Sequence, residues 1–229
     1  MTEKRFFNAP IQLLNGFMED SKSCLDNIFD YAVYYHAENT LFQGEISTRL
    51  KASCNYFGVK PGSYENLSKN GSALVNSLPV NSPKFGISKD IFFDFYKNDK
   101  SQFEKACLLA FLALKSIIGS KPYAKITNGF LWARMDGKPE SVTTETELSS
   151  AILSYSNEYQ TGKIKKHLRD SWGLVYYGRY TRGCFYSFTL SFDDLVFQAE
   201  KRRKSNIDKL HKVKELEAVQ KALIKLNIQ

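Results

Sequence analysis

Cysteine and histidine are scarce in this chain of 229 residues, and they form no cluster that could bind a metal ion. No CxxC pair occurs among its four cysteines, which excludes the common zinc spacings and provides no disulfide framework for a chain of this size. The three histidines have no metal-ligating residue beside them at ligand spacing. We therefore expect four free thiols, most of them buried, and neither a metal nor a cofactor. The residues concerned are Cys24, Cys54, Cys107, Cys184, His36, His167 and His211.

Long apolar segments are also absent. The longest apolar run, Ala106 to Leu114, is far shorter than the roughly 20 residues that cross a bilayer. The first residues, Met1 to Asn8, lack the continuous apolar stretch of a secretory signal. These absences predict a cytoplasmic protein with no membrane partner.

Recognisable catalytic motifs are missing as well. The chain contains neither a phosphate-binding GxxxxGK[ST] loop nor a dinucleotide-binding GxGxxG. Two carboxylate pairs, Asp90 with Asp94 and Asp193 with Asp194, fit solvated helix positions and helix caps better than a metal site. We expect a protein that is not an enzyme.

Basic residues, by contrast, are concentrated at one end. The whole chain has 32 Lys and Arg against 24 Asp and Glu, a net charge of +8. Residues 160–229 hold 15 of the basic and 7 of the acidic residues, so the first 159 residues hold 17 of each. Because the entire excess lies in the last 70 residues, the pattern indicates a surface that faces a polyanion.

The content of 43% hydrophobic and 14% aromatic residues is sufficient for a folded core. Apolar residues recur at helical spacing over residues 6–57, and residues 58–86 are rich in Gly, Pro, Ser and Asn, with one short helix expected around residues 64–75. We predict a mainly α fold (α+β) in two parts. Residues 1–86 form a helical module that ends in a long connection, and residues 87–229 form a basic module.

Helix caps mark the start of the second part. Ser88 can cap one helix, and Ser101 with Glu104 forms a capping box for a second helix that ends at Gly119. The second helix is apolar on nearly every face, which is typical of a central core helix. We expect four of its residues to be buried, namely Ala106, Leu109, Leu112 and Ile118.

A basic helix and a hairpin follow. Thr144 and Glu147 form another capping box, which predicts a helix carrying Leu148, Ile152 and Leu153. After a turn, residues 163–172 form a helix whose Ile164 and Leu168 face inward. Residues 174–180 and 184–190 read as two strands of an antiparallel hairpin. Lys163, Lys166, His167 and Arg169 are then expected on the outer face of this helix, and Arg179 and Arg182 at or near the hairpin tip. Together with Lys165 they are the candidate nucleic-acid-binding residues of this segment.

The order helix, turn, basic helix, hairpin resembles a winged helix-turn-helix domain over roughly residues 143–192. The resemblance implies that the helix holding Lys163 to Arg169 enters the major groove of DNA, and that Arg179 and Arg182 in the wing contact an adjacent groove or the phosphates. The first helix of the family pattern would be residues 101–118, followed by about 25 residues that the compact pattern lacks.

The tail is predicted to be a long helix that begins near Asp193 and Asp194. It carries a basic block, Lys201, Arg202, Arg203 and Lys204, which would extend a phosphate-binding track. Apolar residues follow mainly at three-residue spacing, from Ile207 to Leu226. That spacing drifts around a helix, so it favours packing against the protein's own body or a partner over a coiled coil.

Together these features predict a nucleic-acid-binding protein that acts on DNA, with RNA as the second option. A regulator, a replication-associated factor or a mobile-element or phage protein would use such binding. The alternative is a protein-interaction module, such as a phage-encoded inhibitor, whose basic surface docks an acidic partner protein.

Overall fold

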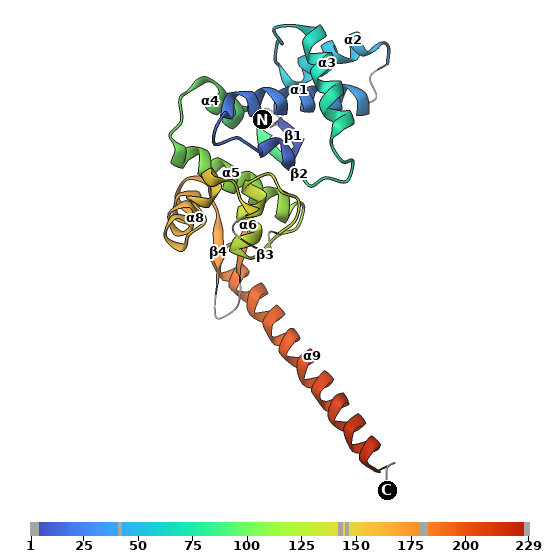
Figure 1. Cartoon of the computed structure of the whole chain (residues 1–229), viewed down its shortest axis with the longest axis vertical. Coiled ribbons are helices and arrows are strands. Elements are labelled where there is room, and N and C mark those ends of the chain that lie inside the picture. Colours follow the sequence, from blue (N-terminus) through green and yellow to red (C-terminus); the bar gives the residue numbers. More distant parts are fainter. Residues whose placement is uncertain (1–4, 41–42, 142–143, 145–146, 179–182, 227–229) are drawn as a thin grey trace.

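The computed structural model describes residues 5–40, 43–141, 144, 147–178 and 183–226, with side chains to residue 221. A body of helices with two small sheets is followed by a long C-terminal helix that projects from it (Figure 1). The expected fold class, mainly α with some β and a long C-terminal helix, is therefore confirmed.

The first element is a strand, although the sequence predicted only helices over residues 6–57. Strand β1 (Phe6–Pro10) pairs antiparallel with β2 (Lys84–Ser88), with Phe7 opposite Ile87. Phe7 and Ala9 face the core while Phe6 and Asn8 face outward, the alternation of a half-buried strand. A 3-10 turn, η1 (Ile11–Leu14), then leads to the helices.

Three helices complete the N-terminal part: α1 (Ser21–Asn39), α2 (Ile46–Phe57) and α3 (Tyr64–Ser77). Helix α3 is longer than the short helix expected within the connection. Ser63 caps it by accepting a hydrogen bond from the amide of Asn66 at 3.2 Å. Gly71 lets α3 approach α1 closely, because a Cβ atom there would lie 2.4 Å from the Cβ of Tyr34.

Helices α4 (Lys89–Lys97) and α5 (Gln102–Ile118) start at the predicted caps. Ser101 and Glu104 form the capping box, and Gly119 ends α5 with φ of 58°. The four residues expected to be buried in α5 are all at most 6% exposed, which confirms α5 as the core helix. They are Ala106, Leu109, Leu112 and Ile118.

The chain after α5 forms the second sheet and three helices. In order, the elements are β3 (Ala124–Ile126), α6 (Asn128–Met135), α7 (Ser150–Leu153), α8 (Glu158–Trp172), β4 (Val175–Tyr177) and β5 (Cys184–Ser187). The predicted antiparallel hairpin is confirmed for β4 and β5, with Val175 opposite Ser187. Strand β3, which the sequence did not predict, pairs with the other edge of β5, so the order is β3-β5-β4.

The capping box at Thr144 and Glu147 is formed, but it does not open the predicted helix that carries Ile152. Both the amide and the hydroxyl of Thr144 donate to Oε1 of Glu147, at 3.3 and 3.1 Å. Helix α7 nevertheless begins only at Ser150 and is capped by Ser149. The three apolar residues that this helix was expected to carry do not all face the core, because Leu148 and Ile152 are buried whereas Leu153 is 42% exposed.

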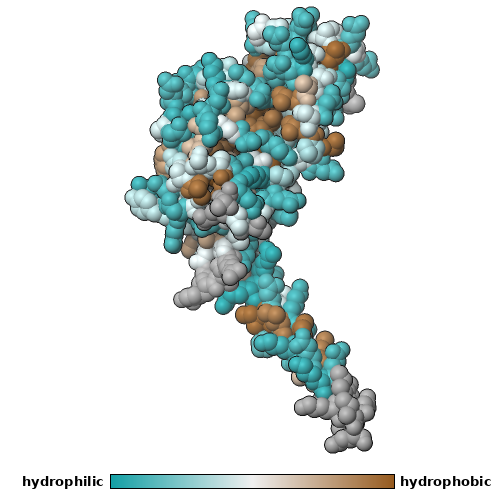
Figure 2. All heavy atoms as spheres, in the orientation of Figure 1, coloured by the Kyte–Doolittle hydropathy of each residue, from teal (hydrophilic) through white to brown (hydrophobic). Residues whose placement is uncertain are grey.

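Helix α9 (Phe192–Leu226) begins on the body and then leaves it (Figure 1). Leu195 and Ala199 are buried with Phe185 of β5. From Lys201 to Lys221 every side chain is exposed, so the expected packing of this segment on the protein's own body is not observed. Its apolar residues lie on the helix surface among polar neighbours (Figure 2).

The predicted division at residues 86 and 87 falls within β2. One cluster of buried apolar residues extends from Phe7 in β1 through α5 to Tyr186 in β5. The two-module organisation stays a prediction.

Candidate nucleic-acid interface

Helix α8 is the centre of the candidate interface. Asn157 caps its start by accepting from the amide of Gln160 at 2.9 Å, and Gly173, with φ of 69°, ends it. Ile164 and Leu168 are buried as the sequence predicted. Because these two residues face the core, the side chains on the opposite side of α8 face solvent.

Cationic side chains occupy the outer face of α8. Lys163, Lys166 and Arg169 are exposed, at three-residue intervals that place them near one another on the helix. Tyr159, 68% exposed, lies one turn earlier, and its ring centroid is 4.4 Å from the ammonium of Lys163. Arg169 donates through Nε to Asp170 at 2.9 Å, an exposed ion pair that contributes little to stability. We call Tyr159, Lys163, Lys166 and Arg169 the cationic face.

Lys165 lies elsewhere on the helix. It is half-buried and its ammonium is 3.3 Å from Oδ1 of Asn128 and 5.6 Å from the ring centroid of Tyr186. This places its charge towards α6 and the sheet. The structure therefore separates Lys165 from the cationic face, although the sequence grouped them.

His167 also differs from the outward orientation that was predicted. Its half-buried ring lies edge-on to Phe103 of α5 at 5.7 Å and to Trp172 at 6.5 Å. Helical geometry explains the error, because His167 lies next to the inward Leu168 on the border of the buried face.

A cavity of about 580 Å³ lies beside the cationic face. Lys163, Lys166, His167 and Asp170 form the α8 side, and Phe103 and Tyr155 provide aromatic surface from outside α8. Sequence reasoning did not select Phe103 or Tyr155, because they come from segments that only the tertiary fold brings to α8. Both rings are half-buried, and the part of an aromatic face that stays accessible beside cations is suited to stacking against a base.

The β4–β5 hairpin, the predicted wing, lies directly after α8. Gly178 lies close to β5, since a Cβ atom there would be 2.8 Å from the Sγ of Cys184. Gly183 has φ of 89° and lies beside the carbonyl of Ile126. Both glycines permit the strands to approach one another closely. Arg179 and Arg182, predicted at or near the hairpin tip, lie outside the described residues.

The basic block of α9 is joined to the hairpin through Glu200. The hydroxyl of Tyr177 in β4 donates to one carboxylate oxygen of Glu200 at 2.9 Å, and the Nε of Arg203 donates to the other at 2.9 Å. Lys201, Arg202 and Lys204 are exposed beside Arg203. This chain of hydrogen bonds fixes where the basic block begins relative to the β4–β5 hairpin.

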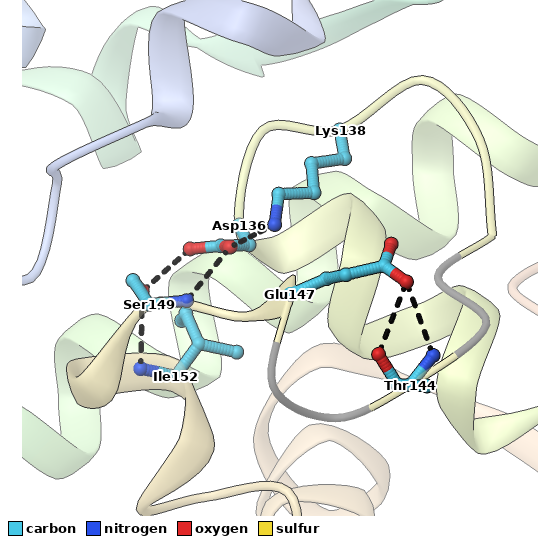
Figure 3. Close-up of polar contacts among 6 residues, drawn as sticks. All are labelled: Asp136, Lys138, Thr144, Glu147, Ser149 and Ile152. Atoms are coloured by element: carbon cyan, nitrogen blue, oxygen red, sulfur yellow. Dashed lines mark hydrogen bonds and ion pairs between the residues drawn. The ribbon is translucent and has the colours of Figure 1, made fainter.

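Polar contacts of Asp136 and of Trp132 hold α8 and the segment before it in place. The carboxylate of Asp136, 5% exposed, accepts from the amide and hydroxyl of Ser149 at 3.0 and 2.5 Å and pairs with Lys138 at 3.2 Å (Figure 3). The indole N–H of Trp132 donates to Thr161 of α8 at 3.1 Å. Trp132 is partly buried against the main core.

Within the described ranges, no group of three His, Cys, Asp or Glu side chains is placed to hold a metal ion. Over the same ranges, no helix combines the length and hydropathy required to cross a membrane. No protein-family model matches the chain, and comparison with curated proteins and with solved structures finds no match.

Proposed function

We propose that roughly residues 143–192, with α5 as the preceding first helix, form a winged helix-turn-helix domain that binds DNA through α8. The order of the elements supports this proposal, since α6 and α7 precede α8 and the β4–β5 hairpin follows it. In such a domain, α8 would lie in the major groove and the hairpin would contact an adjacent groove or the phosphates. The proposed activity is binding without catalysis or a cofactor.

The cationic face is the observation that carries the proposal. Lys163, Lys166 and Arg169 extend from one side of a helix whose opposite side is anchored in the core. Ammonium and guanidinium groups neutralise phosphates and release counterions, and Arg and Lys at a helix surface also reach base edges. Tyr159 adds an exposed ring beside them.

The basic block of α9 extends the same proposal. Lys201, Arg202, Arg203 and Lys204 follow directly after the segment of α9 that packs under β5. A duplex held by α8 and the wing would present its phosphates to this part of α9. The block then contributes sequence-independent affinity.

A matched pair of triple variants tests the proposal. Replacing Lys163, Lys166 and Arg169 together with Ala is expected to weaken binding to a random duplex of about 20 base pairs by more than about tenfold. The control replaces Lys22, Lys51 and Lys69, exposed lysines of α1, α2 and α3, with Ala. The control removes the same charge and is expected to change the affinity by less than about threefold. Fluorescence anisotropy measures both, and duplex RNA as a competitor separates DNA from RNA.

The result that would overturn the proposal is an α8 triple variant that remains folded by circular dichroism and binds DNA like the wild type.

A second candidate is a protein-interaction module that docks an acidic partner. The exposed apolar residues of α9 favour it, because apolar side chains that a projecting helix leaves exposed can contact a partner protein. They are Ile207, Leu210, Val213, Leu216 and Val219, which are 41 to 64% exposed. Replacing Leu210 and Leu216 with Ser would leave DNA binding unchanged under the first proposal and abolish partner binding under the second.

A further inference from the structure

A second concave site lies in the N-terminal part, away from the elements that carry the cationic face. It is a cavity of about 650 Å³ between α1, α4, the start of α3 and the loop of residues 58–63. This volume is within the range of roughly 300–1,000 Å³ that is typical of small-molecule sites.

Aromatic rings form the apolar part of this cavity. Phe92 is buried, and its ring lies 5.3 Å from that of Phe93, 5.9 Å from that of Tyr96 and 6.4 Å from that of Phe29, measured between centroids. All four rings line the cavity. An aromatic group of a ligand can therefore pack against a prepared aromatic surface.

Two carboxylates lie on the α1 wall. Asp26 accepts from the hydroxyl of Tyr96 at 2.8 Å, and Asp30, one turn later, accepts from Nδ2 of Asn70 at 3.2 Å. Both partners are neutral donors. Burial is the main cause that raises the pKa of the Asp30 carboxyl above its usual value, and the nearby Asp26 contributes to the same shift. A cation placed at this wall would stabilise the ionised form of Asp30 and so oppose the rise of its pKa.

Ammonium groups come from other walls of the cavity. Lys89 and Lys97 of α4 lie 6.0 and 5.5 Å from the ring centroid of Phe93, and Lys89 also donates to the carbonyl of Gly58 at 2.9 Å. Lys60 of the loop lines the cavity too. In the part of the chain that the structure describes, no ion pair within 4.0 Å joins any of these lysines to Asp26, Asp30 or another carboxylate.

From this arrangement we infer that the cavity binds a small aromatic zwitterion of the free amino acid class. The ligand's ammonium group lies against Asp26 and Asp30, its carboxylate lies among the lysines, and its ring packs on Phe93 and Tyr96, which Phe92 supports from within the core. One such molecule satisfies both sets of charges that the fold holds apart.

Other ligand classes fit the charges less well. A neutral aromatic molecule leaves the carboxylates and ammonium groups without charged partners. A nucleotide brings a phosphate for the lysines but has no cation for Asp26 and Asp30, so those carboxylates repel its negative charge.

Isothermal titration calorimetry on the full chain tests the inference with L-phenylalanine, L-tyrosine and L-tryptophan. We expect at least one of them to bind saturably with a dissociation constant below about 10 mM. Phenethylamine, which lacks the carboxylate, and 3-phenylpropionate, which lacks the ammonium group, are each expected to bind at least about tenfold more weakly than L-phenylalanine, provided that L-phenylalanine is the amino acid bound.

Variants separate binding in this cavity from binding elsewhere. Asp30→Asn and Lys97→Gln are each expected to weaken amino acid binding by at least about tenfold. Asp90→Asn on α4 and Lys51→Gln on α2 remove the same charges outside the cavity, and they are expected to leave the affinity for the amino acid unchanged. If Asp30→Asn does not fold, the more exposed Asp26→Asn takes its place.

Three results would overturn the inference. They are an absence of binding by all three amino acids at about 10 mM, binding that Asp30→Asn and Lys97→Gln leave intact, and binding of adenosine monophosphate in their place. None of these results bears on DNA binding by α8, because the two sites share no residue.

Discussion

The indole N–H of Trp132 donates to the Oγ1 of Thr161 at 3.1 Å, which joins α6 to α8 behind the cationic face. Thr161 is buried and its hydroxyl lies 3.4 Å from the carbonyl of Tyr155, to which it donates. The contact therefore holds α8 against both of the segments that precede it.

Removing this hydrogen bond is expected to destabilise the fold. Trp132→Phe retains an aromatic ring but leaves the buried Oγ1 of Thr161 without its donor, so unfolding in urea should show a loss of about 1–2 kcal/mol. Trp172→Phe is the matched control, because the structure gives the Trp172 indole N–H no hydrogen bond among the described residues. Equal losses in the two variants would show that ring size, and not the hydrogen bond, determines the effect.

Gly71 and Gly162 are expected to respond to alanine in opposite directions. In α3, a Cβ atom at Gly71 would meet Tyr34 at 2.4 Å and the carbonyl of Asp30 at 2.8 Å, so Gly71→Ala should cost about 1–3 kcal/mol of unfolding free energy. Gly162 in α8 has no atom within 4 Å of such a Cβ, so Gly162→Ala should stabilise the protein by up to about 1 kcal/mol. Thermal unfolding of the two variants measures the difference, and stabilisation by Gly71→Ala would contradict the close packing of α1 and α3.

The thiols are expected to differ in reactivity. Burial raises the pKa of Cys24 and Cys54 to about 11 and that of Cys107 to about 12, so the reactive thiolate is scarce at neutral pH. Cys184 is half-buried in β5 and is the most exposed of the four. Alkylation with iodoacetamide, followed by mass spectrometry over time, should modify Cys184 first. Modification of Cys107 at the same rate in the folded protein would contradict this ordering.

His36 is expected to make stability depend on pH. Burial lowers its pKa, and its Nδ1 lies 3.0 Å from the hydroxyl oxygen of Ser53, which itself donates to the carbonyl of Val33. Because the folded state favours the neutral ring, the stabilisation is present above the unfolded pKa of about 6.5 and is lost as the pH falls through the lower folded value. Urea unfolding at about pH 7 and pH 5 should show a smaller loss of stability for His36→Gln than for the wild type. An identical loss in both would assign the pH dependence to other groups.

Local signals in the sequence were sufficient where a few neighbouring residues determine an element. Ser88 correctly places the start of α4, and the Ser101–Glu104 box and Gly119 correctly place both ends of α5, because caps satisfy backbone groups within one turn. The hairpin was predicted by strand-forming residues on both sides of a turn that ends in Gly183. The burial of Ile164 and Leu168 likewise followed from helical spacing.

Contacts between distant segments could not be predicted in this way. Strand β3 has three residues, too few for a visible alternation, and it exists because β5 offers it an edge. Thr144 and Glu147 have the form of a capping box, yet Asp136 binds Ser149 and the helix starts after that residue. The aromatic wall from Phe103 and Tyr155 beside α8 has no local signal either.

The affinity of the wild-type chain for random duplex DNA, measured from about 50 to 200 mM salt, shows whether the cationic face neutralises phosphates. If Lys163, Lys166 and Arg169 each neutralise a phosphate, the logarithm of the association constant falls with the logarithm of the salt concentration with a slope of about −3 or steeper. An affinity that does not change with salt, or no binding near 50 mM salt, would contradict the account and favour an acidic protein as the partner of the cationic face.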